Sequence, residues 1–367
     1  MDSTGRQERI GPYVSFVTWV RNDGYTDDYA RRVNRATLCL ARQLDRARIE
    51  SEIILTEWNP LADRPLLLEV INLPAAMEHV TVRGIVVPPE FHRRFAGAHE
   101  GGLHGSEAAN VGVRRARGSF ITPKASDTFF SPQAIDMIAW KNLDPDTMYR
   151  MDRQDIAIDD SAIWDLDDGE LLARLEALPS IRHTCIQQVP YWRLHDLHTN
   201  ACGDFTLMGA AYYHLLRGYP RDESILSLDA DSLMMHAAAA HGVRECRWPA
   251  PCTIYKPLHG NLNSVRITPS WTAWQHAWDR FLRTKVSLEA AHWFRTHLDY
   301  PRRKVRGFSS VLGASVENNF VKPASRWARG SYPIPTQPQN WGLADKALEE
   351  RILCRAAWDT ASSPVSA

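Results

Sequence analysis

Three apolar runs near the amino terminus alternate with helical patterns, and this order constrains the fold more than any other feature of the chain. The first run, YVSFVTWV, starts at Tyr13 and stops at the polar Arg21. Two further strands are expected over residues 52–56 and 80–87, the second of them halted by Pro88. β-Branched and aromatic runs without polar alternation are typical of strands buried on both faces. The order strand, helix, strand, helix, strand therefore predicts a doubly wound α/β sheet.

Charge and cysteine content exclude several classes of protein. The 43 Lys and Arg residues balance the 43 Asp and Glu residues, so no overall field favours nucleic acid, and we expect no nucleic-acid partner. No apolar run is long enough to span a bilayer, and the polar start MDSTGRQER lacks the apolar core of a secretory signal. The six cysteines show no CxxC spacing, which argues against a zinc ribbon or a disulfide scaffold. These features predict a cytoplasmic protein without a transmembrane segment or a tightly bound cofactor.

The stretch EAANVGVRRARGSFITPKASD, residues 107–127, runs from a short basic helix into an apolar strand that ends on a carboxylate. Asn110 and Arg114 lie four residues apart and so share one face of that helix. Gly118 ends the helix, and the strand then leads toward Asp127. Ligands bind at the carboxyl ends of the strands in open α/β sheets. The arrangement suits a phosphorylated ligand.

The second half of the chain is expected to hold a strand over residues 148–156, a strand-like segment over 202–208 and a strand over 252–256. A helix over residues 231–241 begins on carboxylates, because Asp229 and Asp231 shortly precede the apolar run LMMHAAAA. Negative charge is stabilised at the amino end of a helix. Beyond residue 260 the sequence is rich in Trp and Arg, and Trp residues at helical spacing predict a helical appendage.

The order of these segments carries a resemblance. The chain is similar to bacterial glycosyltransferases of the GT-A fold, and among them to the family-two sugar transferases, in the segments FVTWVRND, IILTEWNP, EAANVGVRRARGSFI with the trailing Asp127, YRMDRQDI, CGDFTLM with GYP, LDADSLMMHAAAAHG, IYKPLH and NWGLAD. The match covers about residues 13–260, with NWGLAD near the end. The resemblance implies a GT-A-like doubly wound mixed sheet flanked by helices, with a C-terminal helical appendage.

The resemblance also implies an organisation and a reaction. A flexible N-terminus (1–12) would precede a nucleotide-sugar-binding half (13–160), an acceptor-binding half (161–260) and a helical C-terminal extension (261–367). The reaction would transfer a sugar from a nucleotide-sugar donor to a hydroxyl acceptor, with inversion at the anomeric carbon. A carbohydrate, a lipid-linked glycan and a small molecule stay open as acceptors, for the synthesis of a glycan, a polysaccharide or a glycosylated natural product. The basic segment PRRKVRG leaves peripheral membrane contact open.

In folds of this kind the ends of the first two strands hold the nucleoside, and the donor phosphates and sugar lie beside them. Matching positions and nearby basic residues of this chain are the donor-binding candidates. They are Thr18, Arg21, Asn22, Glu57, Asn59, Asn110, Arg114, Lys124, Asp127, Arg153 and Lys256, with Arg150 of second rank.

Three carboxylates are candidates for the base that takes the acceptor proton. Asp231 matches the family's carboxylate at the start of the acceptor-side helix, and Asp229 competes with it from two residues earlier. Asp204 of the CGDF segment is the third. A plain helix cap is the alternative reading of Asp231 and Asp229, and a carboxylate bonded to turn amides is the alternative for Asp204.

Many GT-A enzymes bind Mn or Mg through an Asp-x-Asp element, from which this sequence departs. The position two before Asp127 is Ala125, so one carboxylate is missing, and only His259 remains of a His-x-x-His pattern. Asp127 and His259 alone make a poor metal site, because a hard cation requires several oxygen ligands. Lys124 and Lys256 suggest that fixed ammonium groups replace the metal, so we expect metal-independent or weakly metal-dependent transfer. Solvated surface lysines are the alternative.

Two other functions fit parts of the sequence. A noncatalytic relative that binds nucleotide sugars would explain the departures at Ala125 and Lys256. A sugar nucleotidyltransferase would share the sheet, but such enzymes place a glycine-rich basic segment after the first strand, where this chain has RNDGYTDDYA. Donor hydrolysis measured beside donor binding separates the first alternative from a transferase.

Overall fold

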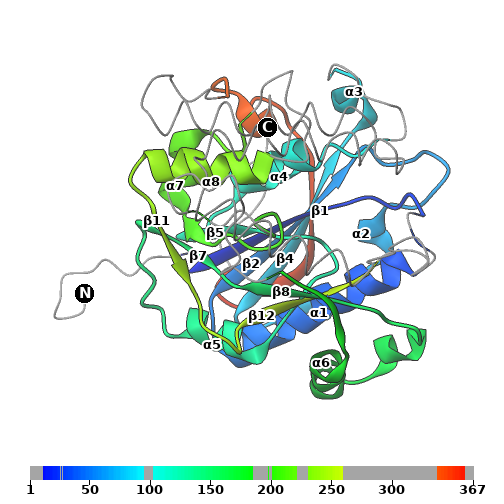
Figure 1. Ribbon diagram of the computed structural model, residues 1–367. Helices are drawn as coiled ribbons and strands as arrows, with labels where there is room; N and C mark the ends of the chain where they lie inside the picture. Colours follow the sequence, from blue (N-terminus) through cyan, green and yellow to red (C-terminus); the bar gives the residue numbers. More distant parts are fainter. Residues whose placement is uncertain are drawn as a thin grey trace, which may run out of the picture.

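A seven-stranded mixed sheet with helices on both faces forms the centre of the protein (Figure 1). The computed structural model describes residues 11–24, 26, 28–94, 102–184, 197, 201–220, 230–258 and 337–359. The strand order of the large sheet is β10-β5-β1-β2-β4-β13-β3. This architecture confirms the predicted mixed α/β sheet flanked by helices.

Four parallel strands make up the middle of the large sheet: β1 (Val14–Val20), β2 (Ser51–Trp58), β4 (Val80–Val87) and β5 (Phe120–Pro123). Every residue of β2, β4 and β5 is buried, because helices cover both faces of the sheet. Burial on both faces explains why these strands read as continuous apolar runs in the sequence.

The order of the parallel strands reverses next to β1. The chain moves outward from β1 to β2 and β4, and then returns to the other side of β1 to form β5. Such a reversal is a topological switch point, where a crevice opens at the carboxyl ends of the strands and ligands bind. The pairing of Val17 with Pro123, and the bond from Lys124 N to the Val17 carbonyl oxygen at 2.8 Å, fix the register there. Thr18 and Lys124 therefore lie side by side at the switch point.

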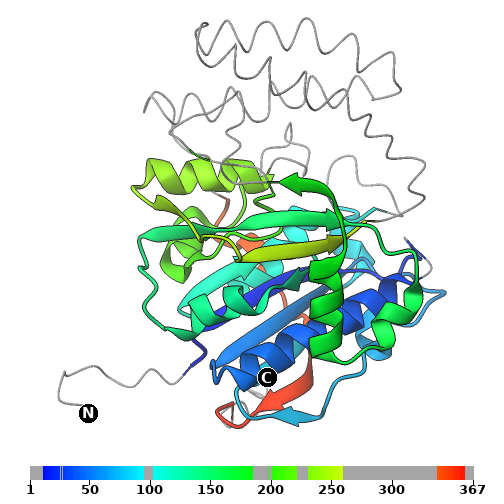
Figure 2. The ribbon, with the colours of Figure 1, turned by 60° about the horizontal axis from the view of Figure 1, so that its bottom comes forward.

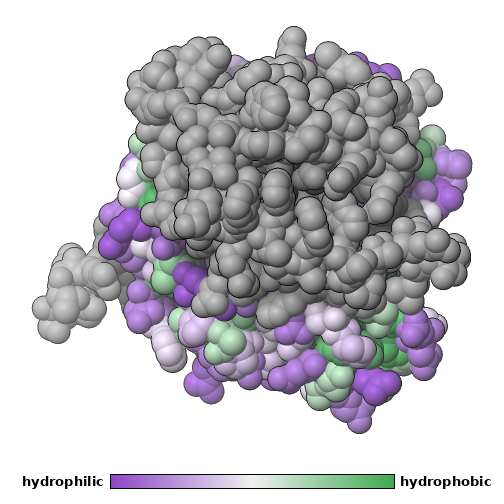
Figure 3. Space-filling view, viewed as in Figure 1, coloured by the Kyte–Doolittle hydropathy of each residue, from purple (hydrophilic) through white to green (hydrophobic). Residues whose placement is uncertain are grey.

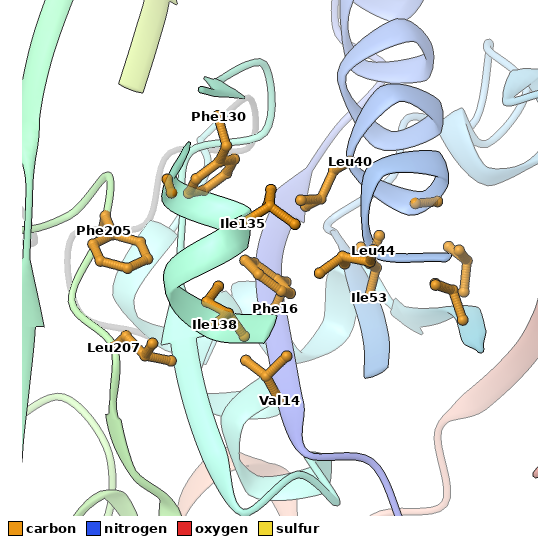
Figure 4. Close-up of a cluster of buried hydrophobic side chains, with 14 of the residues drawn as sticks. Val14, Phe16, Leu40, Leu44, Ile53, Phe130, Ile135, Ile138, Phe205 and Leu207 are labelled. Carbon is orange, nitrogen blue, oxygen red and sulfur yellow. The ribbon is translucent and has the colours of Figure 1, made fainter. Parts of the chain in front are cut away.

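Two layers of helices cover the sheet. On one face lie α1 (Tyr29–Arg46) and α5 (Pro132–Ala139), and on the other lie α4 (Gly105–Arg115), α7 (Ala210–Leu216) and α8 (Ala230–Ala240) (Figure 1). Leu40 and Leu44 of α1 pack against Phe16 and Ile53 of the strands in the first of these layers (Figure 4). Burying each such side chain stabilises the fold by about 1.5–3 kcal/mol.

A smaller sheet with the order β6-β12-β8-β9 lies beside the first layer. Its strands are β6 (Phe129–Phe130), β12 (Thr253–Pro257), β8 (Asp152–Ile156) and β9 (Ser180–Thr184). Helix α6 (Asp168–Ala177) lies near α1 and this sheet (Figure 2), where Leu171 and Leu175 share a buried cluster with Ala36 and Cys39 of α1. The short elements are α2 (Leu67–Val70), α3 (Pro89–His92), η1 (Ser161–Asp165) and β3 (Ala76–Met77).

Two strands predicted from the sequence differ in the structure, so these two predictions were wrong. The single strand expected over residues 148–156 is divided at Met151 into β7 (Thr147–Arg150), which pairs with β11 (Arg244–Arg247), and β8, which pairs with β12. The break allows one extended segment to serve two sheets. The strand expected over 202–208 is mostly turn and ends in the short β10 (Met208–Gly209), because residues 201–204 fold back in a turn from the Asp204 amide to the Ala201 carbonyl.

The end of the described chain adds a strand where a helical extension was expected. Strand β13 (Glu349–Ala356) follows the short helix η6 (Trp341–Leu343) and pairs antiparallel with β4 and parallel with β3. Most of its residues are partly or fully exposed, so its sequence lacks the apolar pattern that would reveal a strand. The remainder of the predicted extension, residues 261–336, and the basic segment within it lie outside the described residues.

Within the described residues, no helix is long and apolar enough to cross a bilayer. The part of their surface visible in Figure 3 mixes hydrophilic and hydrophobic side chains.

Candidate functional site

Two buried polar side chains lie at the switch point between β1 and β5. Lys124, directly after β5, is only 2% exposed, and within the described residues its ammonium makes one hydrogen bond, to the Ser126 carbonyl oxygen at 3.4 Å. The hydroxyl of Thr18 is also buried and has no hydrogen-bond partner among the residues the structure describes. Burial lowers the pKa of Lys124 to about 8, although the charges of Asp127 and Asp204 oppose this shift. Both groups can donate hydrogen bonds to an anion.

The loop after β5 brings Asp127 to the first turn of α1. Asp127 is buried, and the nearest guanidinium nitrogen of Arg32 lies 3.8 Å from its Oδ2 atom. Arg32 also donates to the hydroxyl of Thr26 at 2.8 Å and to the carbonyl oxygen of Leu258 at 3.5 Å. It therefore joins α1, the loop after β5 and the end of β12. The sequence predictions did not include Arg32, whose only signal is its position four residues after Asp28.

A buried ion-pair network connects the smaller sheet to the turn at residues 201–204. Asp155 and Lys256 are paired in the register of β8 and β12, so their side chains start from neighbouring positions. The ammonium of Lys256 donates to Oδ1 of Asp204 at 2.9 Å, and the guanidinium of Arg153 contacts both Asp204 and Asp155. Burial acts to raise the pKa of Asp204, but the Lys256 and Arg153 charges outweigh it and hold the pKa below its ordinary value. Asp204 is therefore an ionised acceptor that is already engaged.

Asp231 lies in the first turn of α8, as the sequence predicted. Its Oδ1 atom accepts a hydrogen bond from the backbone amide of Ser232 at 2.7 Å. Gly203 packs directly against it, since a Cβ atom at position 203 would lie 2.6 Å from Oδ2 of Asp231. Burial raises the pKa of Asp231 and the charge of Asp204 adds to this, against hydrogen bonds from Cys202 and Ser232. A carboxylate with a raised pKa is a stronger proton acceptor than an ordinary aspartate.

One residue relates the ammonium groups to the acid. Asp204 lies close enough to both Lys124 and Asp231 for its charge to shift their pKa values. The structure thus brings together seven residues that we call the charged cluster: Lys124, Asp127, Arg153, Asp155, Asp204, Asp231 and Lys256. Six of them are among the sequence candidates, and Asp155 is new. Asp155 was overlooked because a lone carboxylate within a short strand carries no distinctive spacing.

Three of the five candidates for the nucleoside end, Arg21, Asn22 and Asn59, lie beyond the carboxyl ends of β1 and β2, whereas Thr18 and Glu57 lie within these strands. The guanidinium Nε of Arg21 donates to the carbonyl oxygen of Asn59 at 2.7 Å, and the Asn59 amide donates to the carbonyl oxygen of Gly102 at 3.0 Å. Asn59 has a φ of 53°, a left-handed conformation that asparagine tolerates better than most residues. The Asn22 side chain donates to Pro65 O at 2.9 Å. These contacts join the two strand ends, where Arg21 and Asn59 are buried.

Glu57, another candidate for the nucleoside end, caps a short helix in the structure. Its buried carboxylate accepts hydrogen bonds from the backbone amides of Leu67 at 2.6 Å and Leu68 at 3.0 Å. It therefore caps the amino end of α2, where the helix leaves amides without partners. Burial raises the pKa of Glu57 against these two bonds. Glu57 therefore holds α2 in place, and its role in donor binding stays a prediction.

Asn110 and Arg114 bind partners outside the charged cluster. Helix α4, which carries both, packs on the sheet face opposite to α1, and it ends at the side of the sheet where β5 begins. The Asn110 side chain is fully buried, accepts from the Tyr219 amide at 2.7 Å and donates to the Tyr219 carbonyl oxygen at 3.2 Å. The Arg114 guanidinium stacks 5.1 Å from the ring of Trp341. The spacing correctly placed both residues on one helical face, but that face packs on protein.

Of the remaining candidates, Arg150 lies within the described residues and two others do not. Arg150 is fully buried behind α8, where its Nε donates to Phe205 O at 2.8 Å and a guanidinium nitrogen lies 3.6 Å from Glu245. Its charge acts to lower the pKa of Asp231. Asp229 and His259 lie outside the described residues, so the competing base and the second predicted metal ligand stay predictions.

Comparisons with known proteins find similarity in structure only. No family model matches this chain, and no curated protein matches it. The crystal structure of S. aureus TarS 1–349 in complex with UDP-GlcNAc has a TM-score of 0.43 and 12% identity, over 86% of this chain and 79% of that chain. TarS 1–349 alone has a TM-score of 0.41 and 12% identity, over 87% and 79% of the two chains. A longer TarS structure has a TM-score of 0.36 and 10% identity, over 87% and 49%.

Proposed function

We propose that this protein is a glycosyltransferase, which moves a sugar from a nucleotide-sugar donor to a hydroxyl group of an acceptor. The observation that carries the proposal is that Asp204, ion-paired with Lys256 and Arg153, lies within electrostatic reach of both Lys124 and Asp231. It puts buried positive charge and an acid of raised pKa into one cluster at the switch point. Sugar transfer needs both groups, because a base must take the acceptor proton while the departing diphosphate gains negative charge.

Each end of the donor has a matching surface. The base and ribose would bind next to Arg21, Asn22 and Asn59, beyond β1 and β2. The diphosphate would follow at the ends of β1 and β5, next to Thr18 and Lys124. This order matches the general position of ligands in doubly wound sheets, across the switch point.

Asp231 is the proposed base. The acceptor oxygen attacks the anomeric carbon, its proton passes to the Asp231 carboxylate, and the bond from the anomeric carbon to the diphosphate oxygen breaks with its electron pair on the diphosphate. A single displacement of this kind inverts the anomeric carbon. Asp204 is the weaker candidate, because Lys256 and Arg153 engage it and hold its pKa low. We assign Asp204 to positioning the two cations.

Donor binding tests the proposal first. Thermal unfolding should be measured with a panel of nucleotide sugars, beginning with UDP-GlcNAc, the ligand of the S. aureus TarS complex. Release of nucleoside diphosphate should then be followed with candidate acceptors from the carbohydrate, lipid-linked and small-molecule classes. We expect at least one nucleotide sugar to raise the melting temperature and to be consumed. A panel without any stabilising donor would reject the transferase.

The same measurements separate the other two functions. Donor binding without turnover by any acceptor or by water would indicate a noncatalytic nucleotide-sugar-binding protein. Release of inorganic pyrophosphate from a nucleoside triphosphate and a sugar phosphate would indicate a nucleotidyltransferase.

A further inference from the structure

We infer that Lys124 and Thr18 form an anion site that holds the diphosphate of the donor without a divalent cation. The identity of this anion rests on the proposed function, whereas the site itself rests on the contacts of the two side chains. In this inference the chain's own ammonium groups stabilise the negative charge that develops on the departing diphosphate.

Lys124 is a buried cation that lacks a close counter-ion in the described part of the chain. An ammonium group has three donors, and the single bond of Lys124, to Ser126 O at 3.4 Å, is long. Among the same residues Lys124 forms no ion pair within 4.0 Å, so the charges of Asp127 and Asp204 act on it from a greater distance. Burying a charge in this way is costly unless a partner compensates it. An anionic ligand oxygen would supply that partner.

Thr18 provides a second donor beside it. The β1–β5 register sets Thr18 next to Lys124, and the buried Thr18 hydroxyl lacks a hydrogen-bond partner among described residues. Two neighbouring donors without adequate acceptors are unusual, since most buried polar groups in proteins are bonded. A phosphate oxygen can accept from an ammonium and a hydroxyl at once.

Three of the four acids of the charged cluster already face cations of the protein and so do not fit a divalent cation. Asp204 is bound by Lys256 and Arg153, Asp155 is bound by Arg153, and Arg32 lies 3.8 Å from Asp127. Over the described part of the chain, no group of three or more His, Cys, Asp or Glu side chains is placed to hold a metal ion. Mg and Mn prefer near-octahedral oxygen ligands, and these oxygens already face cations.

Lys256 extends the site toward solvent. Its side chain is about a quarter exposed, and its ammonium pairs with Asp204, whose charge also acts on Lys124. A diphosphate has two phosphate groups, so Lys124 can bind one of them and Lys256 the other. The lowered pKa of Lys124, caused by burial, agrees with a group that gains its full charge when an anion arrives.

Calorimetric titration with inorganic pyrophosphate in EDTA tests the inference, because this probe carries neither base nor sugar. We expect the protein to bind pyrophosphate in EDTA, and we expect Lys124→Met to weaken binding by at least about tenfold. Lys346→Met is the matched control, since Lys346 is a surface residue that pairs with Asp345. It should bind as the wild type does. Binding that requires Mg or Mn, or equal affinity in Lys124→Met, would overturn the inference.

A second variant protects the test against misfolding. Lys124→Met removes a buried charge and keeps the length of the side chain, so its melting temperature without ligand should equal or exceed that of the wild type. Thr18→Val removes only the hydroxyl, and we expect it to weaken pyrophosphate binding by about three- to tenfold. Unchanged affinity in Thr18→Val, together with a Lys124→Met protein that does not fold, would also reject the site.

Failure of the inference and failure of the proposed function give different results. Pyrophosphate binding in EDTA by a protein that accepts no nucleotide sugar would keep the anion site and reject the transferase. Sugar transfer that stops on chelation and returns with Mn would keep the transferase and reject the lysine site.

Discussion

The ammonium nitrogen of Lys256 lies 2.9 Å from Oδ1 of Asp204, and this ion pair joins β12 to the turn that precedes β10. The pair holds Asp204 ionised between Lys124 on one side and Asp231 on the other. A charge in this position raises the pKa of both neighbours. The same carboxylate therefore favours a charged lysine at the leaving group and a stronger base at the acceptor.

Asp231→Asn should remove the proposed base. We expect kcat to fall by about 10²- to 10⁴-fold, because general base catalysis contributes about that much, with little change in the KM for the donor. Steady-state kinetics measure both constants. Asp345→Asn is the control, since Asp345 is an exposed partner of Lys346. A variant at position 231 with full kcat would assign the base elsewhere, first to Asp229.

The direction of the change in stability caused by Asp231→Asn also follows from the pKa of Asp231. The folded pKa of Asp231 lies above its ordinary value of 3.8, so between these values the folded state binds more protons than the unfolded chain. Stability then falls as the pH rises through this window, and the ionised carboxylate costs stability at neutral pH. The asparagine variant should therefore melt no lower than the wild type at pH 7. A clear loss of stability would contradict the direction of the shift.

Lys124 predicts an alkaline limit for anion binding. Its pKa in the folded protein is about 8, below the ordinary 10.5, so stability without ligand should rise between these pH values as the buried group loses its proton. Pyrophosphate needs the protonated form, and its affinity should fall by up to about tenfold per pH unit above pH 8. Titrations at a series of pH values measure this. Lys124→Met should show only the pH dependence of pyrophosphate itself, and an identical profile in both proteins would argue against Lys124.

Gly203→Ala tests the position of the base and not its chemistry. The new Cβ atom would lie 2.6 Å from Oδ2 of Asp231, so the carboxylate or the turn must move. Because small displacements of a catalytic group cost large factors in rate, we expect kcat to fall by about tenfold to a hundredfold. Gly169→Ala, in the first turn of α6, is the control, since its nearest contact would be 3.4 Å. Equal kcat values in the two variants would show that Asp231 is not held by this contact.

Asn110→Ala separates a structural role from donor binding. The change leaves the Tyr219 amide without its partner, at about 1–3 kcal/mol for a buried group, while the Tyr219 carbonyl oxygen keeps the bond from Gln337 at 2.8 Å. We expect denaturant unfolding to show that loss, with the donor KM unchanged. Asn142→Ala, at an exposed position, should leave both quantities as they are. A raised donor KM at unchanged stability would return Asn110 to the donor site.

The sequence predicted the large sheet well for a physical reason. Buried parallel strands demand continuous apolar runs, and β4 was predicted with its observed bounds. The carboxyl ends of these strands followed from the same pattern, which led to Thr18 and Lys124. The start of α8 was also predictable, since acids favour the amino end of a helix, and Asp231 lies there.

The other features could not be predicted from the sequence, because they depend on contacts between residues far apart in the chain. Asn110 and Arg114 share a helical face, but only the packing of α4 reveals that this face meets Tyr219 and Trp341. Arg32 lies on the buried side of α1, where periodicity favours apolar residues, because Asp127 and the end of β12 lie beside it. Tertiary contacts of this kind override local preference.

Strand β13 has a consequence for how the chain is made. It lies between β4 and β3 inside the large sheet, and Thr81 of β4 bonds to Asp359 at 3.0 Å across 278 positions of sequence. During synthesis β4 leaves the ribosome long before its neighbour exists, so its outer edge presents unpaired amides and carbonyl groups. Such an edge recruits other chains, and pairing over this separation is slow. The nascent protein should therefore depend on chaperone protection until β13 arrives.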